Sequence, residues 1–384
     1  MKAVLRPNSP EAELLLDCCR PTPASDGAGF SAKPLDFEQL ASLAQRHGVL
    51  PQLARRLLAR TESDKSDNIA LSRIFRAADA IALRCQYLIE QLASVLAQFT
   101  QAGIETLLVK GPVIGALVYG DPSLRPFGDL DLVVHPRQVP IAAEALIRLG
   151  FCSSPFDQEA FASGFFDAVE GNFQRSEDRV NIDLHWDLMP RAFPFGPSGE
   201  AIWGHSRTID LNGISVRTLS NEDHLLYMAT HTARHGWEFL SQVCDIAYYL
   251  KDVPIDWSLL LERASTTHSV RILAIALVLA RELLSAPIPA AGEEFLRDHD
   301  EVQAVAHQIR EDLIAGRHPK ATTRLWRILS LIDRPADRLR YLAHSAFAPT
   351  LMDRHAIRLP RWAYPAYFLV RPPRLAFSLT RQRR

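Results

Sequence analysis

Residues 105–134 of the 384-residue chain read ETLLVKGPVIGALVYGDPSLRPFGDLDLVV, and this segment constrains the fold more than any other. The run ETLLVK predicts a strand that ends at the tight turn of Gly111. Pro112 then suits the first turn of a short helix over PVIGALVY, because no helical hydrogen bond is lost there. The run DLDLVV predicts a second strand. A strand, a turn, a short helix and another strand therefore follow one another directly.

Two aspartates alternate with leucines on the second predicted strand. Side chains alternate faces along a strand, so Asp129 and Asp131 point to one face and the intervening leucines to the core. Two carboxylates side by side repel each other, and this arrangement is favourable mainly when a divalent cation lies between them. The pattern therefore indicates a metal site, and Mg²⁺ or Mn²⁺ is the ion that we expect.

A third carboxylate follows in VNIDLHWDL, residues 180–188, where alternation places Asp183 and His185 on one strand face. If this strand lies beside the first, Asp183 joins the two earlier aspartates. Three carboxylates around two metal ions can activate an attacking hydroxyl and stabilise a leaving pyrophosphate. His185 has four open roles: orienting Asp183, contacting the acceptor, acting as a base, or packing as a structural histidine.

The Lys110–Gly111 turn is suited to a phosphate group. A glycine before a helix lets backbone N–H groups approach a phosphate closely, and the helix dipole favours negative charge there. Lys110 adds a positive charge to the same oxygens. The turn and the aspartates together indicate a site for a nucleoside triphosphate such as ATP, held by backbone donors at one end and by metal at the other.

These motifs resemble the nucleotidyltransferase fold of the DNA polymerase beta superfamily. More specifically, LLVKG, LRPFGDLDLVV, IDLHWDL and HTARHGWEFLSQVCDIAYYL are similar to the uncharacterised bacterial nucleotidyltransferase family NTP_transf_5, over about residues 35–250. The superfamily turn usually reads Gly-Ser, whereas this chain has the Lys-Gly of the narrower family. The resemblance implies metal ligation by Asp129, Asp131 and Asp183, and phosphate contacts near Lys110 and Gly111.

Three further side chains have alternative interpretations. Arg125, four residues before Asp129, contacts the triphosphate or pairs with a carboxylate such as Asp121; we favour the triphosphate. His231 and His235 have the i, i+4 spacing of helical zinc ligands, but HTARH lacks the acid of a zinc protease helix. We therefore favour histidines that line a cleft or bond to Asp245 over a zinc site.

The mixture of helical and strand patterns predicts an α+β fold, with a small mixed β-sheet nucleotidyltransferase core flanked by N-terminal and C-terminal helical regions. The helical patterns include 35–60 and 74–99, and RTIDLNGISVRTL predicts a hairpin with a type I′ turn. We expect four regions: an N-terminal helical region (1–100), a catalytic core (101–219), a C-terminal helical region (220–350) and a basic aromatic tail (351–384).

Composition limits the class of protein and its partners. The chain has 43 basic and 44 acidic side chains, which disfavours a nucleic-acid partner for the chain as a whole. Its five cysteines fit no disulfide scaffold, and we expect no signal peptide and no membrane span, so a cytoplasmic location is predicted. From Arg354 onward, however, eight arginines and no acid alternate with aromatic residues. This tail predicts contact with a membrane surface or an acidic partner, chiefly through residues 371–384. Residues 354–370 are instead expected to pack on the helical region.

The sequence therefore predicts a magnesium-dependent enzyme that transfers a nucleoside monophosphate from a nucleoside triphosphate to a hydroxyl or phosphate group. The acceptor is a small molecule, a peptide or a protein, and nucleic acid is less favoured. One alternative is a phosphoryl or glycosyl-phosphate transferase with the same metal site. The other is a non-catalytic scaffold that binds nucleoside triphosphate. Adjacent carboxylates favour an enzyme, because a scaffold has no need of repelling charges.

Overall fold

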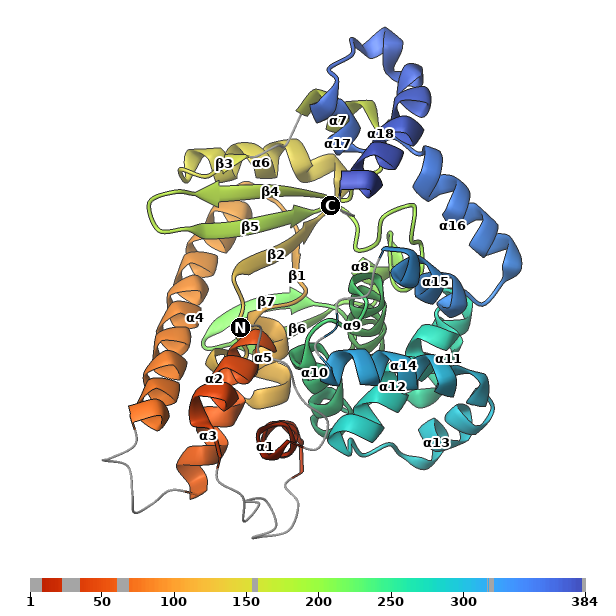
Figure 1. Ribbon diagram of the computed structural model, residues 1–384. Coiled ribbons are helices and arrows are strands. Elements are labelled where there is room, and N and C mark those ends of the chain that lie inside the picture. The colour runs from red at the N-terminus through yellow and green to blue at the C-terminus, as the bar shows by residue number, and fades with distance from the viewer. Residues whose placement is uncertain are drawn as a thin grey trace.

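The computed structural model has one five-stranded mixed sheet among many helices, which confirms the α+β prediction. Figure 1 shows the sheet in the upper half of the molecule, with most of the helices beside and below it. The segments that the structure describes are 9–22, 35–60, 69–153, 158–315, 317 and 321–381.

The sheet has the strand order β1-β2-β5-β4-β3. The central pair, β2 with β5, is parallel, and all other neighbours are antiparallel. The neighbouring strands β4 and β5 form an antiparallel hairpin, and β1 is shorter than the expected strand over ETLLVK. The strands are β1 (Thr106–Leu108), β2 (Asp129–Val134), β3 (Cys152–Ser153), β4 (Glu170–Arg175) and β5 (Val180–His185).

One face of the sheet packs against α4 (Ile69–Gln101) and α6 (Val139–Arg148). Leu130 and Leu132 of β2 and Ile182 of β5 are fully buried in this core, as their alternation predicts. The aspartates between them consequently lie on the opposite face. The helix expected over 74–99 is confirmed, and it extends further at both ends.

The opposite side of the molecule is a helical core that N-terminal and C-terminal helices share. Its centre is α12 (Val270–Leu284), in which nearly every side chain is buried. Each group of helices therefore covers apolar surface of the other. Around it lie α1 (Pro10–Cys19), α2 (Phe37–Arg46), α3 (Leu50–Arg60), α5 (Pro112–Tyr119), α9 (Asn221–His235), α10 (Leu240–Asp252), α11 (Trp257–Thr266), α13 (Ala290–Arg297) and α14 (Gln303–Ile314).

Short elements complete the middle of the chain. The hairpin of β6 (Arg207–Leu211) and β7 (Ile214–Thr218) forms as expected. Its turn residues Asn212 and Gly213 have φ angles of 52° and 86°, which a type I′ turn requires. The others are η1 (Pro122–Leu124), η2 (Pro136–Gln138), α7 (Gln158–Ser163), α8 (Ala201–Gly204) and η3 (Asp300–Val302).

The C-terminal region forms several separate helices, and the last of them contains two prolines in its interior. Helix α18 (Tyr367–Arg381) runs through Pro372 and Pro373. These prolines cannot donate to the carbonyls of Phe368 and Leu369, which are exposed residues where water can take the place of the lost donors. The preceding elements are α15 (Ala321–Leu331), α16 (Pro335–Phe347), α17 (Leu351–Ala356) and η4 (Arg361–Ala366). In the described segments, no helix has the length and apolar character needed to cross a membrane.

Candidate active site

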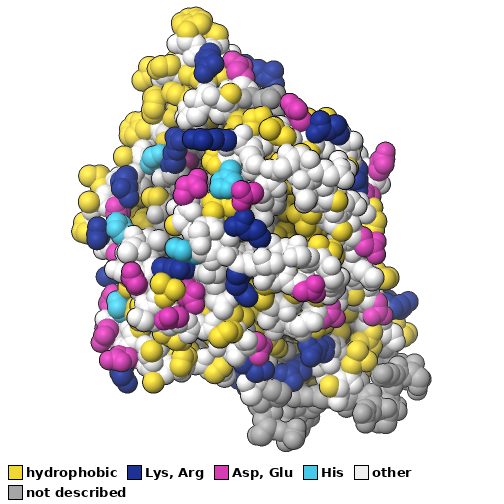
Figure 2. Space-filling view, turned by 180° about the vertical axis from the view of Figure 1, so that it is seen from behind, with side chains coloured by type: hydrophobic (Ala, Val, Ile, Leu, Met, Phe, Trp, Pro, Cys, Tyr) yellow, Lys and Arg dark blue, Asp and Glu magenta, His cyan; other side chains and the backbone are white. Residues whose placement is uncertain are grey.

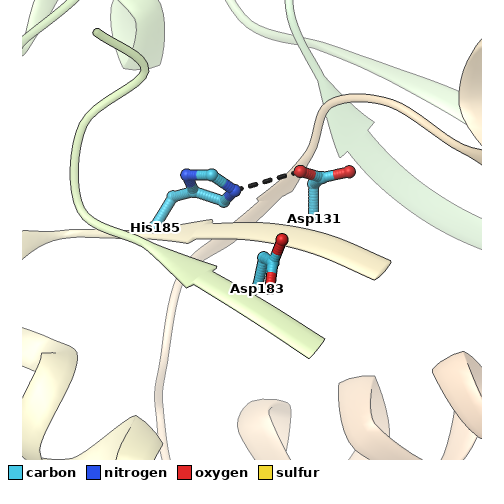
Figure 3. Close-up of side chains that lie close together, drawn as sticks. All are labelled: Asp131, Asp183 and His185. Carbon is cyan, nitrogen blue, oxygen red and sulfur yellow. Dashed lines mark hydrogen bonds and ion pairs between the residues drawn. The ribbon is translucent and has the colours of Figure 1, made fainter. Parts of the chain in front are cut away.

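Three side chains on two neighbouring strands form a candidate metal site. The parallel register of β2 and β5 places Asp131 opposite Asp183, and His185 follows two residues later on the same face. One potential ligand atom of each residue lies within 4.8 Å of the other two. Figure 3 shows all three side chains on one side of the sheet. The structure thus brings together two of the three expected aspartates with His185.

Asp131 is the most enclosed of these groups, with 2% of its side chain exposed. Its Oδ1 accepts a hydrogen bond from Lys110 Nζ at 2.5 Å and lies 3.0 Å from His185 Nε2. Burial alone would raise the pKa of Asp131, but Lys110 and His185 together hold it well below its usual range. Asp131 is therefore ionised at neutral pH, and its Oδ2 atom points away from His185 (Figure 3).

Asp129 lies two residues before Asp131 on the same strand, and it stays outside the group of three. Burial, together with repulsion from Asp131 and Asp183, raises the pKa of Asp129 to about 6. The repulsion expected from the sequence therefore falls on Asp129, whereas Asp131 is stabilised by its cationic partner. A cation near Asp129 would stabilise the ionised form of its carboxyl group.

Asp183 is partly buried and has one polar partner on the neighbouring strand. Asn172 Nδ2 donates to Asp183 Oδ1 at 2.6 Å. Burial raises the pKa of Asp183. The hydrogen bond from Asn172 opposes this rise, and repulsion from Asp131 adds to it. The donor set of carboxylate oxygens and one imidazole fits a divalent ion, because two of the three aspartates have charged forms that a cation would stabilise.

Strand β4 contributes two side chains that the sequence analysis missed. Glu170 is paired with His185 and Asn172 with Asp183 in the antiparallel register of β4 and β5. Glu170 Oε2 lies 3.3 Å from His185 Nδ1, so the ring of His185 lies between two carboxylates. Their alternation in EGNF was the available signal, but it identifies partners only after the hairpin register is known.

The turn before α5 requires a glycine. Gly111 has a φ of 45°, in the region that favours glycine, and it caps α5 without a side-chain hydrogen bond. Lys110 Nζ lies 5.8 Å from the centre of the Tyr227 ring on α9. Burial would lower the pKa of Lys110, but Tyr227 and Asp131 reverse this and raise it. The ammonium group therefore keeps its charge beside the carboxylates.

Arg125 is held by a partner that the sequence did not predict. Its Nε donates to Asp245 Oδ2 at 2.8 Å, and both side chains are largely buried. The hydroxyl of Tyr119 donates to the other oxygen of Asp245 at 3.2 Å. Asp121, the partner considered from the sequence, instead accepts from Ser123 at the start of η1. Arg125 therefore belongs to a buried ion pair that links η1 to α10.

His231 and His235 lie on α9 with ring centres 4.6 Å apart. Burial, with Arg234 and Lys110 adding to it, lowers the pKa of His235 to about 4. Burial and Lys110 also lower the pKa of His231. Both rings are consequently neutral at pH 7, and both lie close enough to the site for the charge of Lys110 to lower their pKa values. The carboxylate oxygens of Asp245 bond to Tyr119 and Arg125 instead of these histidines.

A cavity of about 660 Å³ lies elsewhere, between α3, α5 and α10, and none of the site residues discussed above lines it except Tyr119. Volume alone would point to that cavity. The carboxylate cluster is the stronger candidate site, because catalysis of phosphate chemistry depends on charged groups held together rather than on enclosed space.

Comparison with known proteins gave a family match and one structural match. The model of a family described as uncharacterised nucleotidyltransferase, NTP_transf_5, matches residues 33–285. The crystal structure of an antigenic nucleotidyltransferase-like protein from Paracoccidioides brasiliensis is 16% identical, with a TM-score of 0.33, over 53% of this chain and 94% of that chain. No curated protein matches the chain in sequence.

Proposed function

Because this chain belongs to the family of uncharacterised nucleotidyltransferases, we propose that it transfers a nucleoside monophosphate from a nucleoside triphosphate to an acceptor hydroxyl or phosphate. The observation that carries the proposal is the parallel register that sets Asp131 beside Asp183, with Lys110 bound to Asp131. Two carboxylates and a fixed cation at a strand–turn–helix junction suit a triphosphate better than an uncharged substrate.

Asp131 and Asp183 would hold a divalent ion, Mg²⁺ or Mn²⁺, with Asp129 as a further ligand. Such an ion, when bound, neutralises phosphate charge and favours ionisation of the attacking hydroxyl. His185 would keep Asp131 oriented, since its Nε2 lies 3.0 Å from Asp131 Oδ1. The raised pKa values of Asp129 and Asp183 support this assignment, because both carboxylates gain from a nearby cation.

Lys110 and Gly111 would contact the phosphates that leave as pyrophosphate. The positive φ of Gly111 turns the chain into the start of α5, where the helix dipole favours an anion, and Lys110 is a charged donor beside it. Arg125 would reach the triphosphate through the guanidinium nitrogens other than Nε, which binds Asp245. Lys110 and Arg125 would thus supply positive charge opposite the carboxylates.

In the proposed reaction an acceptor oxygen attacks the α-phosphorus in line with the leaving group. A bond forms between that oxygen and the phosphorus, and the bond to the oxygen bridging the α- and β-phosphates breaks. Pyrophosphate leaves with the electron pair of the broken bond, and the acceptor proton passes to solvent. The acceptor that we propose is a small molecule, a peptide or a protein. The five free cysteines suit the reducing cytoplasm that we propose as the compartment.

The test uses each nucleoside triphosphate labelled at either the α- or the γ-phosphate, with cell extract as the source of acceptor and Mg²⁺ or Mn²⁺ present. Transfer of the α-label with release of pyrophosphate supports the proposal. Transfer of the γ-label alone would instead show a phosphoryl transferase, and binding without any transfer would show a scaffold. Asp183→Asn should abolish transfer, whereas Glu282→Gln, an exposed acid on α12, should leave it unchanged.

A further inference from the structure

Large hydrophobic side chains are exposed mainly in the C-terminal helices. Of the sixteen that are exposed in the described part of the chain, ten lie between residues 325 and 369. Figure 2 shows hydrophobic side chains gathered over the top of the molecule, where Figure 1 places α17 and α18. Single exposed hydrophobic residues are ordinary in folded proteins, but a concentration in one region marks an interaction surface.

The most exposed part of this region also carries positive charge. Trp362 and Leu369 are 85% and 79% exposed. Arg358 and Arg361 of the same segment are also exposed, and no acid occurs from residue 354 to the end of the sequence. We name this surface the Trp362 face; its residues are Ile357, Arg358, Arg361, Trp362, Phe368 and Leu369.

The remaining side chains of the same segment hold it in place. Tyr364 and Tyr367 are buried in a small core with Phe166 and Ala160. Arg371 and Arg374 both bind the fully buried Asp353, so these two arginines of the tail are held against the fold. The Trp362 face is therefore the outer side of a packed segment, and its exposure does not come from a loose chain end.

We propose that the Trp362 face docks on a membrane surface that contains anionic lipid. Tryptophan and arginine together suit the boundary between lipid headgroups and acyl chains, because the indole ring is amphipathic and the guanidinium group binds phosphate. A symmetric dimer through this face would place the arginines of two copies together without an acid from the same segment to neutralise them. An anionic headgroup supplies that negative charge.

This surface differs from the one favoured by the sequence. The pattern placed docking in residues 371–384 and packing in residues 354–370. The structure ties Arg371 and Arg374 to Asp353 and leaves Trp362 exposed. The side chains of residues 377–384, which include the last three arginines of the chain, lie outside the part that the structure describes, so docking through them stays a prediction. Docking through the Trp362 face requires no nucleotide, so its test is independent of the proposed transferase activity.

The experiment is co-sedimentation of the full chain with vesicles of phosphatidylcholine alone or with about 30% phosphatidylglycerol. We expect sedimentation only with the anionic vesicles at low salt, and weaker binding at high salt because of screening. Arg358→Gln/Arg361→Gln should weaken binding roughly 25-fold, since each basic side chain near an anionic leaflet strengthens it about fivefold. Trp362→Ser/Leu369→Ser should also release the protein.

Leu83→Ser is the matched control, because Leu83 is 68% exposed on α4, outside the Trp362 face. It should sediment like the unmodified chain. Equal sedimentation of all variants, or none with anionic vesicles at low salt, would overturn the proposal. Light scattering after gel filtration gives a second criterion: a dimer that Trp362→Ser dissociates, without lipid binding, would identify the face as a contact between copies instead.

Discussion

The ammonium group of Lys110 lies 2.5 Å from Oδ1 of Asp131, and the two side chains are only 19% and 2% exposed. The pair joins the turn before α5 to the strand that carries the aspartates. Because both groups are shielded from water, each depends on the other for compensation of its charge. Lys110 therefore fixes the position of the carboxylate while it presents positive charge toward the site.

We expect Lys110→Met to be both inactive and less stable. Loss of the ammonium leaves Asp131 as a buried carboxylate with His185 as its remaining close partner, which should lower the free energy of unfolding by about 3 kcal/mol. Nucleotidyl transfer should fall at least roughly 100-fold, as when one fixed donor to a transition state is removed. Urea unfolding and α-label transfer measure the two effects. Lys251→Met, outside the site, should transfer label normally; an active Lys110→Met enzyme would contradict the phosphate role.

Asp129→Asn and Asp131→Asn should differ in stability although both should stop transfer. The sequence alone suggested that either change relieves repulsion. In the structure, only substitution of Asp129 relieves repulsion, because the carboxylate of Asp131 compensates the charge of Lys110. We expect Asp129→Asn to be as stable as the unmodified chain or more so, and Asp131→Asn to lose about 3 kcal/mol. Chemical denaturation in the presence of EDTA compares them, and equal stabilities would refute this difference.

The pKa of Asp129 predicts a pH dependence of stability. This pKa rises from its ordinary value of 3.8 to about 6 in the fold, so between these values the folded chain binds a proton that the unfolded chain has lost. The stabilisation is complete below about pH 4 and disappears as the pH rises through about 6. Without metal, the unmodified chain should lose on the order of 2 kcal/mol relative to Asp129→Asn across this range. Urea titrations from acid to neutral pH measure it, and Mg²⁺ should reduce the difference.

The ion pair of Arg125 and Asp245 should show strong coupling in a double-mutant cycle. Arg125→Met or Asp245→Asn leaves a buried partner uncompensated, so each should lower the free energy of unfolding by about 3 kcal/mol. The double variant should be less destabilised than the sum of the two, by about 2 kcal/mol. Additive losses would show that the pair contributes nothing. If the double variant still binds nucleotide like the unmodified chain, the role of Arg125 is structural; weaker binding supports a contact between Arg125 and phosphate.

His231 and His235 should hold no stoichiometric zinc. Their helical spacing permits a shared ion, but the group of potential ligands that converges in the described chain is Asp131, Asp183 and His185. Elemental analysis of protein purified without a histidine tag provides the measurement. One tightly held zinc ion per chain, lost in His231→Ala, would show that these histidines form a metal site.

The features that the sequence determined are those set by neighbouring residues. Gly111 before a proline-started helix, Asp129 and Asp131 on one strand face, and Asn212–Gly213 at a hairpin turn were all predictable. Each depends on local backbone angles or on strand alternation, which a few residues fix. The α+β class follows from the same local patterns, whereas the division into four regions stays a prediction.

The tertiary structure decided which charged groups are partners. Arg125 binds Asp245, 120 residues away, in place of the nearby Asp121, and Glu170 reaches His185 only through the register of β4 with β5. Arg371 and Arg374 converge on Asp353, whereas Trp362 is the most exposed large hydrophobic side chain in the described part of the tail. Such choices depend on which elements pack together, and the hydrophobic core drives that packing without specifying the polar pairs in any local pattern.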